Sequence, residues 1–222
     1  MNMHNALARE QEQVQVVQLN DFPVSKRAMD ILGAISALVL FSPIYLIVTV
    51  LILITEGRPI VFRQARLGRG GELFNVWKFR SMCQNAEEIL RSNTKIYKKY
   101  VENNYKLPEG QDPRITRLGH FLRKSSLDEL PQFWNVLTGE MSLVGPRPIV
   151  NDELEEYRNK KGLFLKMKPG ITGVWQVSGR SDLQYPERAK LELSYLDKQG
   201  FWFDAKTIIK TVYCVLTRVG AH

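Results

Sequence analysis

The sequence predicts a helix-rich α+β protein that is associated with a membrane through its N-terminal part. Residues Ile31 to Ile54 form an uncharged apolar run that is long enough to enter a bilayer. Two extended runs flank the glycines at Gly68–Gly71, and most of the later chain has apolar residues at helical spacing. The length of 222 residues fits one globular domain with an attached segment. We therefore expect a polar tail over residues 1–24, a membrane helix over 25–55 and a cytoplasmic domain over 56–222.

The composition favours partners that carry phosphate groups. The formal net charge is +8 and the isoelectric point is about 9.5, which suits nucleic acid, anionic lipid or a nucleotide. Cys83 and Cys214 are far apart in the sequence and the three histidines have no ligand spacing, so neither a disulfide framework nor a zinc site is indicated. His120 is more typical of a packing or surface residue than of a catalytic base.

Ser42 and Pro43 interrupt the apolar run near its centre. Pro43 cannot donate a hydrogen bond to the Val39 carbonyl, so we expect a kink there, and the Ser42 hydroxyl can bond to a freed carbonyl. Each half would be about 18 Å long, which is too short to span a bilayer. Basic residues flank both ends, as expected if both ends are cytoplasmic: Lys26, Arg27, Arg58, Arg63, Arg66 and Arg69. The pattern favours a re-entrant helix, and a straight or kinked spanning helix is the alternative.

The next segment predicts a hairpin, a charged helix and a loop. The glycine cluster Gly68–Gly71 is more typical of a hairpin turn than of a phosphate cradle. Residues 84–104 have a helical, highly charged pattern, and residues 107–113 read as a loop.

Further helices are expected from the residue pattern over 114–124, through the following segment to about Leu137, and over 149–160, 186–198 and 204–219. The first of these would have one apolar face, made of Ile115, Leu118, Phe121 and Leu122. The last is a basic amphipathic helix with Ile208, Ile209, Val212, Val215, Leu216 and Val219 on one side. Such a helix either lies in the lipid headgroup layer or caps the core, and the apolar segment upstream favours the headgroup layer.

The stretch SSLDELPQ places two carboxylates side by side at Asp128 and Glu129. Ser126 and Glu129 match a helix capping box, and acidic residues in a first helical turn also suit the helix dipole. Pro131 fits better if Asp128 is the N-cap, because the proline then replaces an amide that has no partner. A carboxylate held ionised at a helix end suits a cap, a nucleophile or a metal ligand, so the motif alone leaves these roles open.

The loop VGPRP restricts the backbone of Arg147 from both sides. Pro146 fixes its own φ, and Pro148 biases Arg147 toward an extended conformation, so this guanidinium would lose little entropy on gripping an oxyanion. Other basic residues that could join it are Lys78, Arg80, Arg123 and Arg180. Taken singly, each is typical of a surface charge.

Several motifs occur together in a characteristic order: KRAMDI, the Ser42–Pro43 break, FRQARLG, KFRSM, DPRITRLGHFLRKSSLDELPQFWNVLTGEMSLVGPRP and KPGITGVWQVSGR. From about Lys26 to the C-terminus this arrangement resembles the bacterial sugar transferase family, the monotopic phosphoglycosyl transferases. Residues 83–112 and the terminal VLTRVGAH look most like the undecaprenyl-phosphate galactose or glucose phosphotransferase branch.

The resemblance implies an enzyme at the cytoplasmic face of the bacterial inner membrane that starts surface glycan synthesis. Asp128 would attack the β-phosphate of a UDP-sugar and release UMP, and Glu129 would hold Mg²⁺. Undecaprenyl phosphate would then attack the aspartyl-phosphosugar. The surrounding Lys78, Arg123, Arg147 and Arg180 would bind substrate phosphate. Lys26 and Arg27, at the entry to the membrane segment that Ser42 and Pro43 break, would meet the lipid phosphate.

The resemblance also leaves questions open. Many members of this branch carry an additional N-terminal multi-span membrane domain, so we expect a minimal member or part of a larger protein. The sugar is not determined, and Glu140 stands where many relatives have aspartate. The expected partners are a UDP-sugar, undecaprenyl phosphate and membrane lipids, with a homodimer as an open alternative and no nucleic acid. Direct one-step transfer is the enzymatic alternative, and a membrane-anchored basic binding module is the non-enzymatic one.

Overall fold

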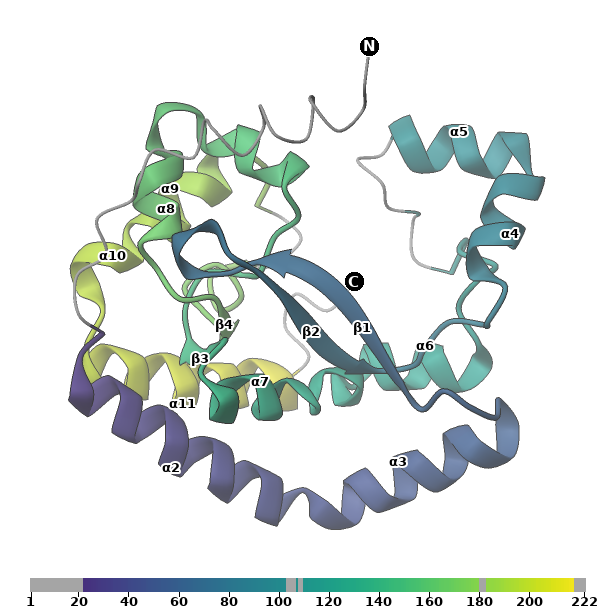
Figure 1. Ribbon diagram of the computed structural model, residues 1–222, viewed down its shortest axis with the longest axis horizontal. Helices are drawn as coiled ribbons and strands as arrows, with labels where there is room; N and C mark the ends of the chain where they lie inside the picture. Colours follow the sequence, from purple (N-terminus) through teal and green to yellow (C-terminus); the bar gives the residue numbers. More distant parts are fainter. Residues whose placement is uncertain (1–21, 103–106, 108–109, 180–182, 218–222) are drawn as a thin grey trace.

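The computed structural model describes residues 22–102, 107, 110–179 and 183–217, so the tail predicted over 1–24 lies mostly outside them. Helices predominate in these ranges, and the described strands form two small sheets. The predicted helix-rich α+β class is therefore confirmed. Figure 1 shows a bent pair of helices along one edge, with the rest of the molecule built on one side of it.

The bent pair consists of α2 (Val24–Leu40) and α3 (Ser42–Thr55), whose axes differ by 59°. Pro43 lies in the first turn of α3, where its missing N–H removes no helical hydrogen bond. The Ser42 hydroxyl donates to the Val39 carbonyl over 2.8 Å, which satisfies a carbonyl at the end of α2. The predicted break at Ser42–Pro43 is thus confirmed, with the predicted hydroxyl contact.

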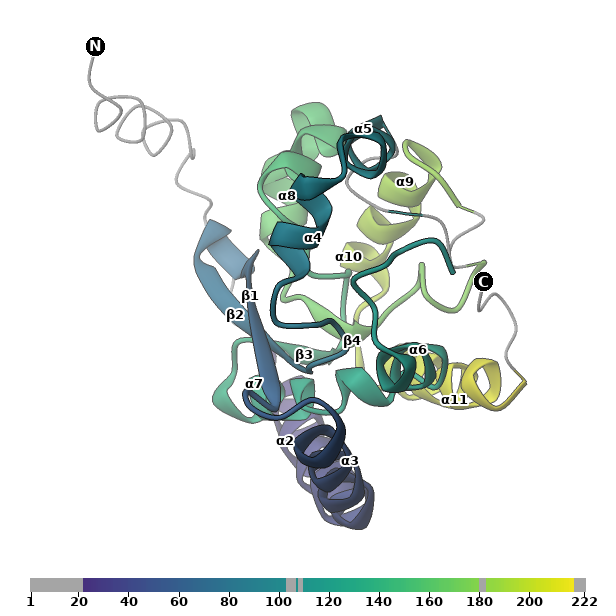
Figure 2. The same ribbon diagram turned by 90° about the vertical axis from the view of Figure 1, so that its right-hand side faces the viewer.

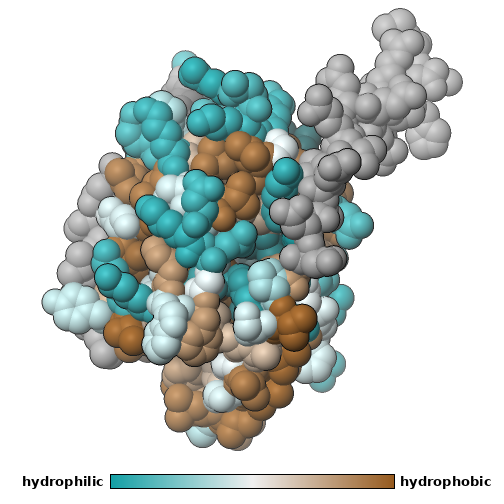
Figure 3. All heavy atoms as spheres, turned by 90° about the vertical axis from the view of Figure 1, so that its left-hand side faces the viewer, coloured by the Kyte–Doolittle hydropathy of each residue, from teal (hydrophilic) through white to brown (hydrophobic). Residues whose placement is uncertain are grey.

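The outer side of α2 and α3 is apolar and exposed. Figure 2 shows the pair projecting from the domain, and in Figure 3 hydrophobic side chains gather at that end of the molecule. Among the described residues, no single helix is both long and apolar enough to cross a membrane, whereas the bent pair passes by length and composition as a broken span or a re-entrant loop. Its exposed apolar side chains include Leu32, Ile35, Val39, Leu46, Ile47 and Ile54.

Strands β1 (Val61–Leu67) and β2 (Leu73–Phe79) form an antiparallel hairpin, as predicted. The turn uses Gly70 and Gly71 at φ values of 79° and 86°, which residues with a Cβ rarely adopt. The register pairs residue 66 with 74, 64 with 76 and 62 with 78. Because paired residues point to the same face of a sheet, Arg66, Val76 and Lys78 share one face of the hairpin.

The helix expected over 84–104 is divided into α4 (Ala86–Ser92) and α5 (Thr94–Glu102). The division occurs at Asn93, whose side-chain oxygen accepts from the Lys95 and Ile96 amides over 3.2 and 3.1 Å and so caps the second helix. The residues described within the predicted 107–113 loop contain no helix or strand.

The helix expected over 114–124 is α6 (Arg117–Lys124) and is shorter than predicted, because the Thr116 side chain caps it by accepting from the Gly119 amide over 2.8 Å. Ile115 instead forms a β-bridge with Met82. Of the expected apolar face, Leu122 is buried, whereas Phe121 is 59% exposed. The prediction of one apolar helix face that includes Ile115 is therefore wrong, because this residue precedes the helix.

The middle of the chain contains two strands that were not predicted. A 3-10 turn η2 (Leu127–Glu129) leads into α7 (Gln132–Thr138), and then β3 (Ser142–Val144) pairs in parallel with β4 (Gly170–Thr172). The loop after β3 approaches the segment before β4 so closely that a Cβ on Gly145 would overlap the Lys168 carbonyl. Three-residue strands are too short for a period-2 pattern to identify, which explains why sequence periodicity missed them.

The helices after β3 also depart from the predicted boundaries. The segment expected as helix 149–160 is a 3-10 helix η3 (Asp152–Lys160), followed by α8 (Lys161–Leu165). The expected helix 186–198 is divided into α9 (Glu187–Leu193) and α10 (Tyr195–Lys198). The last described helix is α11 (Phe201–Thr217), which begins earlier than expected.

Helix α11 exposes several large apolar side chains. Asp204, Thr207 and Cys214 are buried, whereas Trp202 is 83% exposed; Ile209, Val212 and Tyr213 are also exposed. The predicted amphipathic character is present, but Ile208 packs against the core and so separates from Ile209 and Val212. The predicted Val219 lies outside the described residues.

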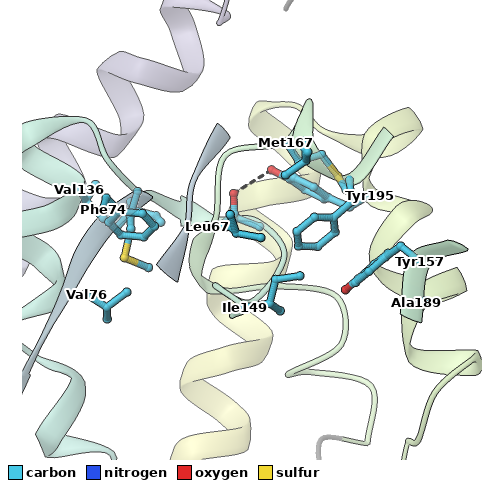
Figure 4. Packing of buried hydrophobic residues seen from close by; sticks show 14 of the residues in the cluster. Leu67, Phe74, Val76, Val136, Ile149, Tyr157, Met167, Ala189 and Tyr195 are labelled. Carbon is cyan, nitrogen blue, oxygen red and sulfur yellow. Dashed lines mark hydrogen bonds between the residues drawn. The ribbon is translucent and has the colours of Figure 1, made fainter. Parts of the chain in front are cut away.

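The main core joins the hairpin to the elements that follow it. Figure 4 shows Leu67 of the hairpin between Phe74 on one side and Ile149, Met167 and Tyr195 on the other. A second cluster packs α3 against the segment around the acidic pair Asp128–Glu129. It consists of Val48, Ile52, Phe79, Leu122 and Leu130. The bent helix pair is therefore packed against the same residues that support the acidic pair.

Candidate active site

The acidic pair lies on the tight turn η2, and it does not form the capping box that the motif suggested. Ser126 adopts a left-handed conformation with φ of 57° and makes no side-chain capping bond. Glu129 accepts a hydrogen bond from the Lys78 ammonium over 2.7 Å instead. The residue that precedes α7 is Pro131, so neither Ser126 nor Asp128 is the N-cap of that helix.

The two carboxyl groups have different surroundings. Asp128 is only 7% exposed, and burial, with a smaller contribution from the Glu129 charge, raises its pKa to about 6. The Glu129 side chain is 34% exposed. Its desolvation opposes ionisation, but Lys78 and, to a lesser extent, Arg147 outweigh it and hold the pKa of Glu129 below its usual value. Asp128 is thus the more basic carboxylate and Glu129 the one bound to a cation.

Arg123 lies on the Asp128 side of the turn. Its Nε donates to the Ser81 hydroxyl over 2.9 Å, and its charge favours the ionised form of Asp128. Helix α6 brings Arg123 to this place because Gly119 lets the helix pack directly on the backbone of Ser81, where a Cβ would overlap the Ser81 carbonyl.

Arg147 reaches the site from the loop after β3. Its backbone N–H bonds to the buried Glu192 carboxylate, and its guanidinium lies 5.7 Å from the centre of the Trp175 ring. The guanidinium forms no ion pair with a carboxylate in the described part of the chain. The predicted constraint on this arginine therefore has support from tertiary contacts in addition to the two prolines.

A pocket lies between the hairpin, the turn η2 that carries the acidic pair, and the loop that carries Arg147. Its lining brings together three predicted residues, Lys78, Glu129 and Arg147, although they are far apart in the sequence. Asp128 and Arg123 stand beside this pocket without lining it. Arg180 lies outside the described residues. Arg80 is directed to the end of α3, where it bonds to the Glu56 and Gly57 carbonyls over 2.6 and 2.9 Å.

The two cations expected at the lipid phosphate are engaged within the protein. The Lys26 ammonium is buried and lies 2.5 Å from Asp204 and 3.0 Å from the Val144 carbonyl. Arg27 donates to the last carbonyls of α7, those of Val136 and Leu137, over 2.6 and 2.8 Å. These contacts do not support direct binding of lipid phosphate by either side chain.

The pocket has the donors that Mg²⁺ uses when it binds together with a phosphate substrate. One carboxylate oxygen of Glu129 accepts from the Lys78 ammonium, and the side chain that carries the second oxygen is partly exposed. No group of three or more histidine, cysteine or acidic side chains suited to a metal occurs among the described residues. Mg²⁺ is commonly held by one or two carboxylates plus substrate phosphates and water, so this donor set fits the ion only with its substrate.

The pocket also contains residues that sequence reasoning did not assign to it, namely Arg66, Gln132 and Gln176. Arg66 could have been found from the hairpin. A turn centred on Gly70 sets the register, and that register puts residue 66 on the same face as Lys78. The two glutamines belong to separate loop and helix segments, and no periodic signal links them to the site.

The model of the family described as bacterial sugar transferase matches residues 22–218. The chain belongs to the bacterial sugar transferase family. Its matched region includes every described element and the whole pocket. The region matched by the family model therefore contains the turn with the acidic pair, Lys78 of the hairpin and the loop with Arg147 in this sugar transferase chain.

Individual relatives support the same assignment. The chain is 44% identical over 200 residues to an undecaprenyl-phosphate galactose phosphotransferase of Salmonella typhimurium, a match covering 89% of this chain and 41% of that protein. It is 39% identical over 226 residues to a UDP-glucose:undecaprenyl-phosphate glucose-1-phosphate transferase of Escherichia coli, covering 96% and 46%. The exopolysaccharide production protein ExoY of Sinorhizobium fredii is 40% identical over 203 residues, covering 90% and 88%. The chain thus spans less than half of the first two relatives and most of ExoY.

Proposed function

We propose that this sugar transferase moves a sugar 1-phosphate from a UDP-sugar to undecaprenyl phosphate. The observation that carries the proposal is the pair of adjacent carboxyl groups with opposite pKa shifts, Asp128 raised and Glu129 lowered, beside a pocket rich in cations. A basic binding module has no use for two acids at this place, because they weaken phosphate binding. The names of the relatives support the same donor and acceptor classes.

The proposed reaction has two steps on one phosphorus atom. An Asp128 carboxylate oxygen attacks the β-phosphorus of the UDP-sugar, and the bond between that phosphorus and the bridging oxygen breaks, so UMP leaves with the oxygen. A phosphate oxygen of undecaprenyl phosphate then attacks the same phosphorus and displaces Asp128. The products are undecaprenyl diphosphate-linked sugar and the free carboxylate.

Each residue of the site has a distinct proposed role. Burial leaves Asp128 poorly solvated, yet a pKa of about 6 keeps most of it ionised at neutral pH. Lys78 and Arg147 face the pocket and would neutralise charge on the transferred phosphoryl group, and Arg123 would favour the ionised nucleophile. Arg180 remains a predicted phosphate ligand. Glu129 would hold Mg²⁺, which would neutralise the charge that develops on UMP.

The proposed location is the cytoplasmic face of the inner membrane. The acceptor phosphate lies at the headgroup plane, so the pocket has to sit close to it. Exposed apolar side chains on α2, α3 and α11 support such a position, and Lys206 and Lys210 on α11 add positive charge next to them.

The decisive experiment measures the intact mass of the purified protein after incubation with a UDP-sugar and Mg²⁺ in the absence of lipid acceptor. We expect a sugar-phosphate adduct on Asp128 together with UMP, and no adduct in Asp128→Asn. The donors tested are UDP-galactose, UDP-glucose and an N-acetylated UDP-sugar, since the relatives' names contain both galactose and glucose.

The same experiment separates the alternatives. UMP formation that always requires the acceptor, with no adduct at any time, would support direct transfer. Failure to release UMP from any donor with or without acceptor would remove the enzymatic proposal. Glu129→Gln is the matched variant: it should slow UMP release and weaken its dependence on Mg²⁺ while Asp128 remains available to form the adduct.

A further inference from the structure

Arg66 occupies the pocket face of the hairpin next to two residues with proposed roles. It lines the pocket together with Lys78 and Arg147, and its side chain is 15% exposed. One guanidinium nitrogen lies 3.3 Å from Glu153, and another donates to the Gln64 side chain over 2.9 Å. A guanidinium has five N–H groups, so these two bonds leave donors that can bind a ligand.

The charges around the pocket are not balanced by its own lining. Lys78 is neutralised by Glu129, which leaves Arg66 and Arg147 as the other two cations of the pocket wall. Arg66 also feels repulsion from Arg147 and Arg188, which helps burial lower the pKa of its guanidinium. The Glu153 carboxylate offsets part of this repulsion at Arg66, whereas Arg147 forms no ion pair in the described part of the chain, so an anion bound in the pocket would reduce the remaining repulsion. A diphosphate supplies such an anion, and it matches the planar donors of arginine.

A network of ion pairs centred on the buried Arg188 connects the surroundings of Arg66 with those of Arg147. Glu153 contacts Arg66 and lies 3.8 Å from Arg188, and Arg188 in turn lies 3.4 Å from Glu192. Glu192 accepts the backbone N–H of Arg147. The Trp175 ring contacts both guanidinium groups, with Arg188 at 4.2 Å and Arg147 at 5.7 Å from its centre. Arg66 and Arg147 are thus held by one shared network although they come from different segments.

We propose that Arg66 binds the diphosphate of the sugar nucleotide beside Arg147, and that Glu153 is the positioning residue that orients Arg66. The inference rests on the proposed function, because it assigns a second arginine to the same donor site. It predicts that the hairpin contributes two cations to catalysis, Lys78 at the acidic pair and Arg66 at the nucleotide.

The test compares inhibition constants for UDP and uridine in the full chain, purified in detergent with Mg²⁺. Arg66→Gln should raise the inhibition constant of UDP at least tenfold, or about 1.4 kcal/mol, and leave that of uridine unchanged. Arg66→Lys keeps the charge but loses the planar donors, so it should lie between Arg66→Gln and the unmodified protein. Glu153→Gln should raise the KM for UDP-sugar three- to fivefold without changing the KM for lipid acceptor.

Arg63→Gln is the matched control, because residue 63 is on the same strand but on the opposite face of the hairpin. It should leave UDP inhibition unchanged. Equal weakening of UDP and uridine in Arg66→Lys, with a lowered melting temperature, would assign Arg66 to structure and overturn the inference. Unchanged UDP inhibition in Arg66→Gln, with normal UMP release by the unmodified protein, would overturn it and leave the proposed function standing. Absence of both UDP inhibition and UMP release in the unmodified protein would overturn both.

Discussion

Asp128 and Glu129 are neighbours in the chain, yet the protein gives their carboxyl groups opposite acidities. The sequence motif alone suits a helix cap, a nucleophile and a metal ligand equally well. The difference comes from contacts at long range, since burial raises the pKa of Asp128 whereas the Lys78 ammonium outweighs the effect of burial at Glu129. Residue 78 is on the hairpin, so no local pattern around SSLDELPQ could reveal this pairing.

The first prediction at this scale concerns pH. Since attack requires ionised Asp128, UMP release without acceptor should fall as the pH decreases through about 6, approaching tenfold per pH unit below it. Lys78 lowers the pKa of Asp128 and Glu129 raises it. The midpoint should therefore move to higher pH in Lys78→Met and to lower pH in Glu129→Gln. The measurement is the second-order rate constant for the single release of UMP per enzyme, from pH 4.5 to 8.5.

The half-reaction is used because a phosphate monoester such as the acceptor also titrates near pH 6. A midpoint that is the same in both variants would show that Asp128 does not set the pH dependence. The midpoint is compared rather than the rate, because both variants also lose contacts in the pocket.

At the scale of elements, the break at Ser42–Pro43 and the hairpin were predictable because proline and glycine act through local backbone chemistry. Helix boundaries were less predictable. Asn93 caps a new helix inside a continuous charged pattern, and Thr116 starts α6 after Ile115 has joined a bridge. Lys26 and Arg27 looked like membrane-flanking charges, but their partners lie more than 100 residues away in the sequence.

The ion pair between α2 and α11 gives the second prediction. Lys26→Met leaves the Asp204 carboxylate buried without its cation, so we expect a loss of about 3–5 kcal/mol in the free energy of unfolding. Lys26→Met combined with Asp204→Leu should lose less, because no charge is left unpaired. Thermal unfolding in detergent provides the measurement.

The exposed pair Glu87–Arg91 provides the control, and Arg91→Gln should leave the melting temperature unchanged. If Lys26→Met were as stable as that control, the Lys26–Asp204 pair would contribute nothing to the stability of the packed α2.

The third prediction tests the close approach of the Arg147 loop to the β4 segment. A Cβ at Gly145 would overlap backbone atoms of Lys168, so Gly145→Ala should shift the loop, lower the melting temperature and reduce UMP release at least tenfold. Gly162→Ala is the matched control, because residue 162 is helical and a Cβ there would meet no atom within 4 Å. It should keep full activity and raise stability slightly. Full activity in Gly145→Ala would mean that the Arg147 loop can move away from the segment before β4 without loss of function.

At the scale of the whole molecule, the bent helix pair predicts a topology. Both ends of the bent helix pair should be on the cytoplasmic side, because the break lies at its centre and basic residues are present at each end. Single cysteines at positions 5 and 85, in a background without Cys83 and Cys214, should both be protected from an impermeant maleimide in intact bacterial cells. Labelling at position 5 alone would indicate a spanning helix. Permeabilised cells, in which both positions should react, provide the control.

The buried contact between Lys26 and Asp204 has a consequence for how the protein is made. Its two partners are separated by 178 residues, so the ribosome must synthesise this whole intervening segment before the contact can form. At a translation rate of 5–20 residues per second, this interval is on the order of ten to forty seconds. During that time the stripe of Lys26 and Asp30 on α2 lacks its partners from β3 and α11. The packing of α2 is thus completed only after residue 204 has been synthesised, and nascent chains that stop before this residue should hold α2 less stably than longer chains.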